Sequence, residues 1–139
     1  MFLVSCEQFN SRYQIEYTDI IYNYDGDTIL IYCLNGLKCE KKGLSVRVRH
    51  VDTPEIKGRC EYERKMAYRA KEFTNKALKR AHSIVLSINQ LNMYDKYDRL
   101  LADILIDGQS LGKMLVENNL GRSYDGGHRD GWCSSDKSW

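Results

Sequence analysis

One segment of the chain, VRVRHVDTPE at positions 46–55, contains the side chains best suited to chemistry. Arg47 has paired donors that match phosphate oxygens, Asp52 is a carboxylate suited to a hard metal ion, and Glu55 is a candidate base. Pro54, the only proline of the chain, fixes its own φ and biases the residue before it toward an extended backbone. Asp52 and Glu55 are therefore expected to project from a stiff turn.

A second acidic segment, DGDT at positions 25–28, lies in an expected hairpin turn. If this turn sits beside positions 46–55, three carboxylates and an arginine converge, which suits metal-assisted attack on a phosphodiester. Asp25 precedes a glycine, and a side-chain hydrogen bond within the turn explains such an aspartate. Asp25 is therefore predicted to form the turn rather than to bind an ion.

Length and composition predict one soluble globular domain over residues 1–139, with a core at about 12–133 and a frayed tail over 134–139. The chain is 42% hydrophobic and 29% charged, which argues against a disordered or fibrous protein. Glu7 interrupts the apolar start of the chain, and no apolar run reaches membrane-spanning length. A cytoplasmic protein without a membrane partner is expected.

The cysteines indicate neither a closed disulfide framework nor a four-ligand zinc site, because their number is odd and no C-x-x-C pair occurs. They are Cys6, Cys33, Cys39, Cys60 and Cys133. Reduced, mostly buried thiols are expected, and contact between Cys60 and Cys133 is the alternative.

The net charge of +2 is too small to indicate nucleic-acid binding by itself, but the charged residues are unevenly distributed along the chain. Between positions 57 and 80, nine Lys and Arg residues stand against three acidic ones. A basic face for nucleic acid and an ordinary solvated helix surface both explain this segment.

The first part of the chain reads as short strands. Residues 13–24 and 28–34 are rich in Ile, Tyr and Thr, and the Asp-Gly pair between them marks a tight turn. Residues 44–49 alternate between apolar and polar side chains, as a half-buried strand does. Tightly turned strands of this kind predict a meander or a small barrel.

From Glu61 onward apolar residues recur at spacings of three and four, which predicts an amphipathic helix of about twenty residues. The members of this stripe are Met66, Ala70, Phe73, Ala77 and Ala81. Residues 84–88 and 100–106 return to strand character, and Ser110 is a candidate N-cap for a second helix that Gly121 would end. This order predicts an α+β domain with a small antiparallel barrel.

Three segments match a known family in order and spacing: YDGDTI at 24–29, VRVRHVDTPE at 46–55 and DKYDRLLA at 95–102. On these segments, the chain resembles the staphylococcal nuclease-like (thermonuclease) family over roughly residues 15–133. The resemblance implies a five-stranded antiparallel OB-fold barrel with two to three packed helices. It also implies a calcium-dependent phosphodiesterase that acts as an endonuclease on single-stranded or locally open DNA or RNA, leaving 3′-phosphate and 5′-hydroxyl ends.

The resemblance also assigns metal ligands by position. Asp27 and Asp52 match the family's carboxylate ligands, and Thr53 matches the ligand that acts through its main-chain carbonyl. A hard divalent ion prefers such oxygen ligands and keeps open positions for a phosphate oxygen and a water. One Ca²⁺ is the expected cofactor, although Mg²⁺ or Mn²⁺ would satisfy the same chemistry.

The remaining site residues carry the reaction and bind the substrate. Glu55 resembles the family's general base, and Arg47 and Arg99 match its two phosphate-binding arginines. Tyr97 and Tyr124 stand near these motifs, where a base or sugar could stack. These assignments predict a catalytic set of Arg47, Glu55 and Arg99 with two tyrosines at the substrate.

Several other residues are weighed and set aside or left open. His50 is expected on the strand face opposite the first arginine, and His82 ends a basic helix, so neither is expected to be catalytic. His128 is interpreted as an exposed loop residue that could border the groove. Arg49 could approach phosphate or form a structural ion pair. Asp98 stands where the family usually has glycine, which predicts a positive φ.

Two other classes of function remain open. A barrel of this kind could bind nucleic acid without cutting it, or could serve only as a scaffold for a protein partner. The complete set of carboxylates and arginines argues against both. A monomer is expected.

Overall fold

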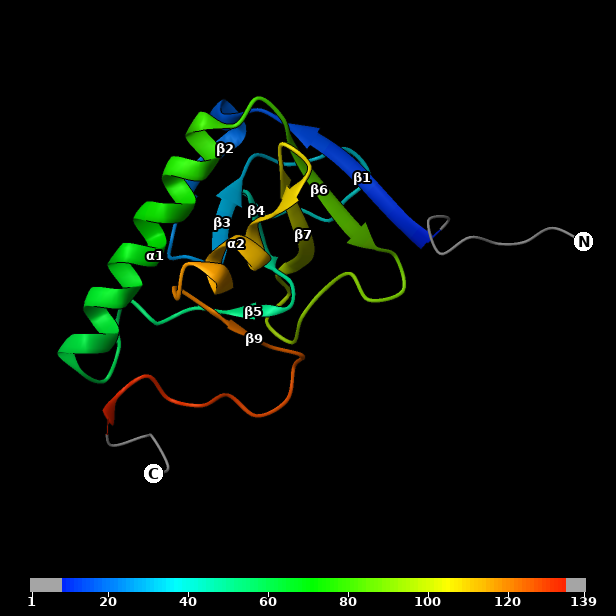
Figure 1. The fold of residues 1–139 in the computed structure, drawn as a ribbon. Helices are drawn as coiled ribbons and strands as arrows, with labels where there is room; N and C mark the ends of the chain where they lie inside the picture. The colour runs from blue at the N-terminus through cyan, green and yellow to red at the C-terminus, as the bar shows by residue number, and fades with distance from the viewer. Residues whose placement is uncertain (1–8, 135–139) are drawn as a thin grey trace, which may run out of the picture.

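Two helices and a set of short strands form the part of the chain that the computed structural model describes, residues 9–134 (Figure 1). The strands are β1 (Asn10–Ile15), β2 (Ile20–Asn23), β3 (Thr28–Ile31), β4 (Leu44–Val48), β5 (Val51–Asp52), β6 (Ile84–Asn89), β7 (Leu100–Ile106), β8 (Gln109–Ser110) and β9 (Arg122–Ser123). The helices are α1 (Glu61–Arg80) and α2 (Leu111–Glu117), with a 3-10 turn, η2, at Tyr17–Asp19. The frayed tail expected over 134–139 lies outside the described residues, except for Ser134.

The main sheet has the order β1-β6-β7-β4-β3-β2, with β8 added to β7. Its two edge strands, β1 and β2, are consecutive in the chain and are joined only through η2. The prediction of one strand over residues 13–24 is therefore wrong, because the turn at η2 divides this range into β1 and β2. The turn is closed by Glu16, whose backbone N–H donates to Asp19 Oδ2 at 2.7 Å. Since one short turn links opposite edges, the sheet has to curl.

The expectation of an all-antiparallel sheet is wrong, because β4 pairs with β7 in parallel. The pairing Val46↔Leu100 and Val48↔Ala102 follows a crossover that includes α1 and β6. Parallel neighbours need a long connection of this kind, whereas alternating side chains say nothing about strand direction. A closed five-stranded barrel is not confirmed, and the mixed α+β arrangement is consistent with an OB-like fold.

The core lies between the curled sheet and the two helices. Along β7 every second residue is buried, so one face of the strand points inward. The buried residues of α1 are Glu63, Ala67, Ala70, Thr74 and Leu78. The helix is present as predicted, but its buried face is shifted from the expected stripe, since Met66, Phe73, Ala77 and Ala81 are only half-buried. Ala70 alone belongs to both sets.

The second helix begins as predicted, because Ser110 Oγ accepts a hydrogen bond from Lys113 N at 3.2 Å. Leu111 and Leu115 are fully buried against the sheet. The predicted end at Gly121 is wrong, since the helix stops at Glu117. Among the described residues, no helix combines the length and the apolarity needed to cross a membrane.

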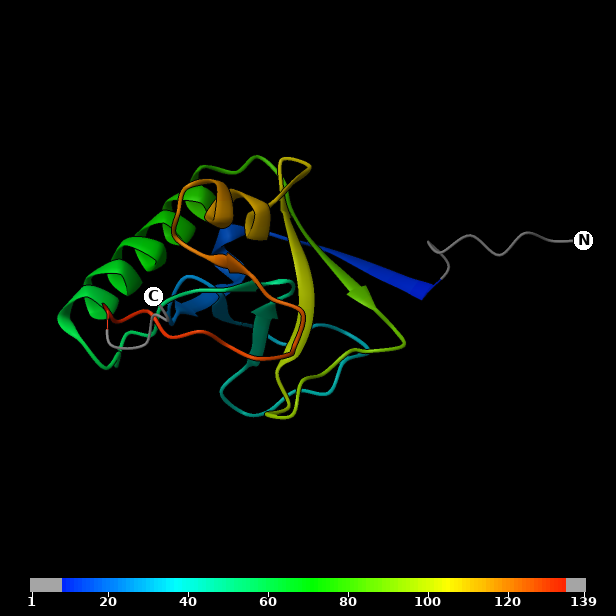
Figure 2. The same cartoon turned by 60° about the horizontal axis from the view of Figure 1, so that its bottom comes forward.

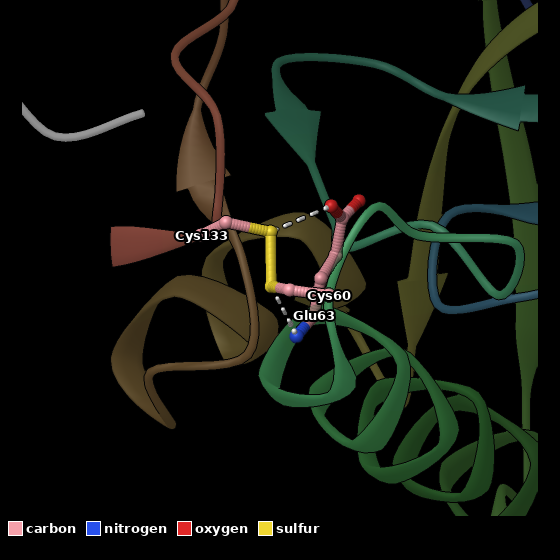
Figure 3. Close-up of side chains that lie close together, drawn as sticks. All are labelled: Cys60, Glu63 and Cys133. Atoms are coloured by element: carbon pink, nitrogen blue, oxygen red, sulfur yellow. Dashed lines mark hydrogen bonds between the residues drawn. A yellow bond between two sulfur atoms is a disulfide. The ribbon is translucent and has the colours of Figure 1, made fainter. Parts of the chain in front are cut away.

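The expectation of reduced thiols is wrong, because the structure contains the disulfides Cys33–Cys39 and Cys60–Cys133. The second joins residues 73 positions apart. After β9 the chain runs back toward the first turn of α1, where Cys133 meets Cys60 (Figures 2 and 3). Spacing alone could not reveal this return path. Cys6 lies outside the described residues.

Replacing Cys60 and Cys133 together by serine should destabilise the fold more than replacing Cys33 and Cys39 together. Cross-link entropy grows with loop length, so we expect losses of about 4 and about 2 kcal/mol for sequence separations of 73 and 6. The N-cap of α1 is preserved in this test, because serine can accept from Glu63 N as Cys60 Sγ does. Urea unfolding of both variants checks the order, and equal midpoints would contradict it.

Candidate active site

The turn between β2 and β3 places Asp27 on the inner side of the molecule. Asp25 makes the predicted turn hydrogen bond, accepting from Asp27 N at 3.1 Å. Thr74 of α1 donates through Oγ1 to the carbonyl of Gly26 at 2.7 Å. This contact fastens the turn to the helix, and the side chain of Asp27 is buried at its far end, with 4% exposure.

Asp27 links the turn to the segment after β5. Its Oδ1 accepts from Thr28 Oγ1 at 3.0 Å, and its Oδ2 accepts from Thr53 N at 3.0 Å. Thr53 is fully buried, and its Oγ1 has no hydrogen-bond partner within the described residues. The structure therefore brings Asp27 and Thr53 into direct contact, as the convergence of the two segments requires.

Arg47 lies between the two buried aspartates. Its Nη2 is 3.4 Å from Asp27 Oδ2 and 3.6 Å from Asp52 Oδ1. Its Nη1 donates to the carbonyls of Val48 and Val51 at 2.7 and 2.8 Å. Arg47 is only 7% exposed, and its guanidinium is bound on two sides. The side chain is therefore held in place before any ligand binds.

Glu55 stands at the more open side of this cluster, with a side chain that is 51% exposed. Its backbone N–H donates to Glu63 Oε2 at 3.2 Å, and Arg59 N donates to Glu63 Oε1 at 3.2 Å. Glu63, buried in the first turn of α1, thus holds both ends of the loop that carries Glu55. Figure 3 shows the Cys60–Cys133 disulfide directly beside this carboxylate. Sequence reasoning missed Glu63, because an acid in a first helical turn usually needs no further explanation.

Arg129 is the second residue that sequence reasoning missed. Its Nη2 contacts Asp52 Oδ1 at 2.5 Å and Glu55 Oε1 at 3.0 Å. It comes from the segment after β9, which runs back toward the first turn of α1 (Figure 2). A lone cation in a glycine-rich loop gave no signal, because its place depends on the return path of the chain.

Arg99 is held by a different carboxylate. Its Nε is 2.7 Å from Asp95 Oδ2, and its N–H donates to Asp95 Oδ1 at 2.9 Å. These backbone and side-chain bonds lower the pKa of Asp95, although burial alone would raise it. Asp98 has the predicted positive φ, 60°. Arg99 is thus fixed by hydrogen bonds within its own turn. Among the described contacts, its ion pair is with Asp95 and not with Asp27 or Asp52.

Two hollows border this region and share Tyr97, Arg99 and Arg129 as lining residues, whereas Asp27 and Asp52 line neither. The larger, about 730 Å³, is lined by Asp25, Glu55, Tyr97, Arg99 and Arg129, among other residues. The smaller, about 380 Å³, is lined by Arg47, Arg99, Tyr97, Tyr124 and Arg129, among others. Arg49 and His50 also line the smaller hollow. The predicted catalytic arginines and tyrosines therefore face shared space.

The other residues considered from the sequence are Tyr97, Tyr124 and His128, which differ in exposure. Tyr97 is 67% exposed, and Arg99 lies 5.4 Å from its ring centroid. Tyr124 is half-buried, with Arg129 at 5.8 Å from its ring centroid. His128 is exposed and 3.3 Å from Asp130, which fits a loop residue.

Burial makes two carboxylates near Arg47 harder to ionise. Burial, followed by the nearby Asp27 carboxylate, raises the pKa of Asp25 to about 8. Burial also raises the pKa of Asp52, although Arg129 opposes this shift. Both shifts mean that negative charge is costly here. The buried carboxylates of Asp27 and Asp52 are oxygen donors of the kind that a hard divalent ion prefers.

Comparison with known proteins gives a family. Residues 45–132 match the family described as staphylococcal nuclease homologue. This chain belongs to the staphylococcal nuclease family. It is also similar to endonuclease YncB of Bacillus subtilis (strain 168), with 37% identity over 103 residues. That match covers 70% of this chain and 43% of YncB, so the chain spans less than half the length of that relative.

In this staphylococcal nuclease homologue, the matched region begins within β4 and ends at Trp132. It includes Asp52, Arg99 and Arg129 but not Asp27. Asp27 reaches the site through strand pairing, because its neighbour Thr28 stands opposite Arg47 in the β3–β4 register.

Gly26→Ala should disturb both the fold and the cluster. A methyl group at Gly26 would lie 2.8 Å from Ala70 Cβ and 2.9 Å from Thr53 Cγ2, so α1 and the turn would have to separate. Overpacking of this kind costs about 1–3 kcal/mol. Gly36→Ala is the control, because a methyl there meets open space and only the positive φ is strained. Denaturant unfolding compares the two, and a milder effect at Gly26 would contradict the packing argument.

Proposed function

We propose that this chain is a metal-dependent phosphodiesterase that hydrolyses DNA or RNA by in-line attack of a water on phosphorus. One observation carries the proposal: Arg47 is held between Asp27 and Asp52, and Glu55 lies beside them at the wall of a groove that Arg99 also lines. The endonuclease name of the YncB relative supports the same class of reaction.

Asp27, Asp52 and the main-chain carbonyl of Thr53 are the residues that would hold one divalent cation. Ca²⁺ is the proposed ion, and the oxygen donor set suits Mg²⁺ or Mn²⁺ as well. Such an ion supplies Lewis-acid stabilisation of the phosphate charge when bound. The buried position of both aspartates keeps their oxygens away from competing solvent.

Glu55 is the proposed general base. Its carboxylate is half-exposed and faces the groove, so it can orient a water and accept its proton. Its backbone is fixed by Glu63, which limits the positions that the carboxylate can take. Arg47 and Arg99 would stabilise the charge that builds on the phosphate oxygens during attack. Products with 3′-phosphate and 5′-hydroxyl ends are proposed from the family resemblance.

The proposed substrate is a single-stranded or locally open nucleic acid bound by a monomer. Tyr97 and Tyr124 border the groove and could stack on bases, while the arginines contact phosphates. A cytoplasmic location remains a prediction from the sequence. The two disulfides favour an oxidising environment instead.

Cleavage of single-stranded DNA by the purified chain should require a divalent cation and stop when a chelator is added. Glu55→Gln should lower the rate about 10²- to 10³-fold, because the amide cannot accept the proton. Glu72→Gln is the matched control, since that glutamate is exposed on α1 and paired with Lys76. Salt-sensitive binding without cleavage would indicate a binding module, and the absence of both would remove the proposal.

Tyr97→Ala should weaken binding of a short single-stranded oligonucleotide by about 1–3 kcal/mol, the contribution of one stacked base. Tyr32→Ala provides the comparison, because Tyr32 is 61% exposed and Tyr97 is 67% exposed, but Tyr32 lines neither hollow. Fluorescence anisotropy at fixed salt measures both affinities. Equal affinities for the two variants would exclude Tyr97 as a stacking residue.

A further inference from the structure

Arg129 makes the closest charged contacts of the cluster, and both are with residues that the proposed function needs. A single nitrogen, Nη2, bridges Asp52 Oδ1 and Glu55 Oε1. Asp52 is a proposed metal ligand, and Glu55 is the proposed base. This inference therefore rests on the proposed function and extends it to a residue outside the recognised motifs.

Arg129 Nη2 is in hydrogen-bond contact with Asp52 Oδ1 at 2.5 Å, whereas Arg47 Nη2 is farther from the same oxygen, at 3.6 Å. A divalent cation bound to that oxygen would therefore be repelled most strongly by Arg129. Arg47 cannot leave easily, because it is buried and bound to two backbone carbonyls. Arg129 is different, since its side chain is 43% exposed and donates its hydrogen bonds to the carboxylates of Asp52 and Glu55. Of the two arginines, Arg129 is thus the one whose side chain an incoming metal ion can displace.

The backbone around Arg129 is anchored on both sides. Before it, Tyr124 N donates to the carbonyl of His50 at 3.0 Å. After it, Arg122 Nη1 donates to the carbonyls of Asp130 and Gly131 at 3.2 and 2.9 Å, and the Arg122 guanidinium lies 3.7 Å from the ring centroid of Trp132. The Cys60–Cys133 disulfide then fixes the segment to α1. A side-chain swing can therefore release Arg129 while its backbone stays over the site.

The space for such a swing is present, because Arg129 lines both hollows. Arg99 lines the same two hollows. A released Arg129 would join Arg99 in facing any phosphate bound there, and its planar donors suit two phosphate oxygens.

We propose that Arg129 is an exchangeable third cation of the site, which holds Asp52 and Glu55 before the metal ion binds and contacts the substrate phosphate afterwards. The exchange links ion binding to phosphate binding, since the first event frees the group that serves the second. If Arg129 formed only a structural ion pair, its loss would loosen the loop. The binding of the metal ion and the binding of phosphate would then both become weaker.

The test is calorimetric titration of the full oxidised chain with Ca²⁺, without nucleic acid. Arg129→Ala should bind Ca²⁺ about tenfold more tightly than the parent protein, as expected when one competing charge is removed from a partly exposed site. Arg129→Lys keeps the charge and should stay close to the parent. Arg80→Ala, at the opposite end of α1, removes an exposed arginine away from the cluster and should change nothing.

The second measurement uses thymidine 5′-monophosphate as the probe, at saturating Ca²⁺. Arg129→Ala should bind this phosphate about tenfold more weakly, so the two affinities move in opposite directions. Unchanged or weaker Ca²⁺ binding in Arg129→Ala would overturn the inference, and so would unchanged phosphate binding. The Asp52→Ala variant separates the two proposals. If the parent protein binds Ca²⁺ and Asp52→Ala does not, the proposed metal site is supported independently of the result for Arg129. A parent chain that neither binds Ca²⁺ nor cleaves DNA removes both.

Discussion

The buried ion pairs of Arg47 with Asp27 and Asp52 are the constraint on which the rest of the site depends. An unpaired charge at this depth would be strongly destabilising, so the β2–β3 turn, β4 and β5 must come together for these three side chains to be paired. The backbone carbonyls of Val48 and Val51 complete the hydrogen bonding of the guanidinium. The contacts that stabilise this buried polar cluster are therefore the same ones that the proposed function would use.

The loop that carries Glu55 depends on α1 rather than on the sheet. Glu63 accepts from the two backbone N–H groups that bracket this loop, and a methyl at Gly58 would meet the Glu63 side chain at 2.6 Å. The disulfide beside Glu63 joins the same helix turn to the segment that carries Arg129. One helix terminus thus positions two charged groups that enter the site from opposite ends of the matched region.

The parts of this structure that follow from local rules could be predicted from the sequence. The first helix, the Ser110 N-cap and the positive φ of Asp98 depend on residues close in sequence, and each is present. The hairpin turn at Asp27 and the strand at Arg47 were predicted separately, and their convergence was stated only as a condition. Arg129 and Glu63 were missed, and contact between Cys60 and Cys133 was only the alternative, because each depends on where a distant segment returns. The Cys33–Cys39 disulfide was missed although its two residues are close in sequence. The break at Tyr17–Asp19 was missed because strand propensity continues through it.

The order of the site residues along the chain has a consequence for biosynthesis. A ribosome delivers Asp27, Arg47, Asp52 and Glu55 well before Arg129 and Cys133. Domains generally fold as units, so Asp52 and Glu55 can gain their outermost guanidinium only after the chain has emerged as far as Arg129. The Cys60–Cys133 bond can close only after Cys133, four residues later, has also been made, and it then ties the segment that carries Arg129 to α1.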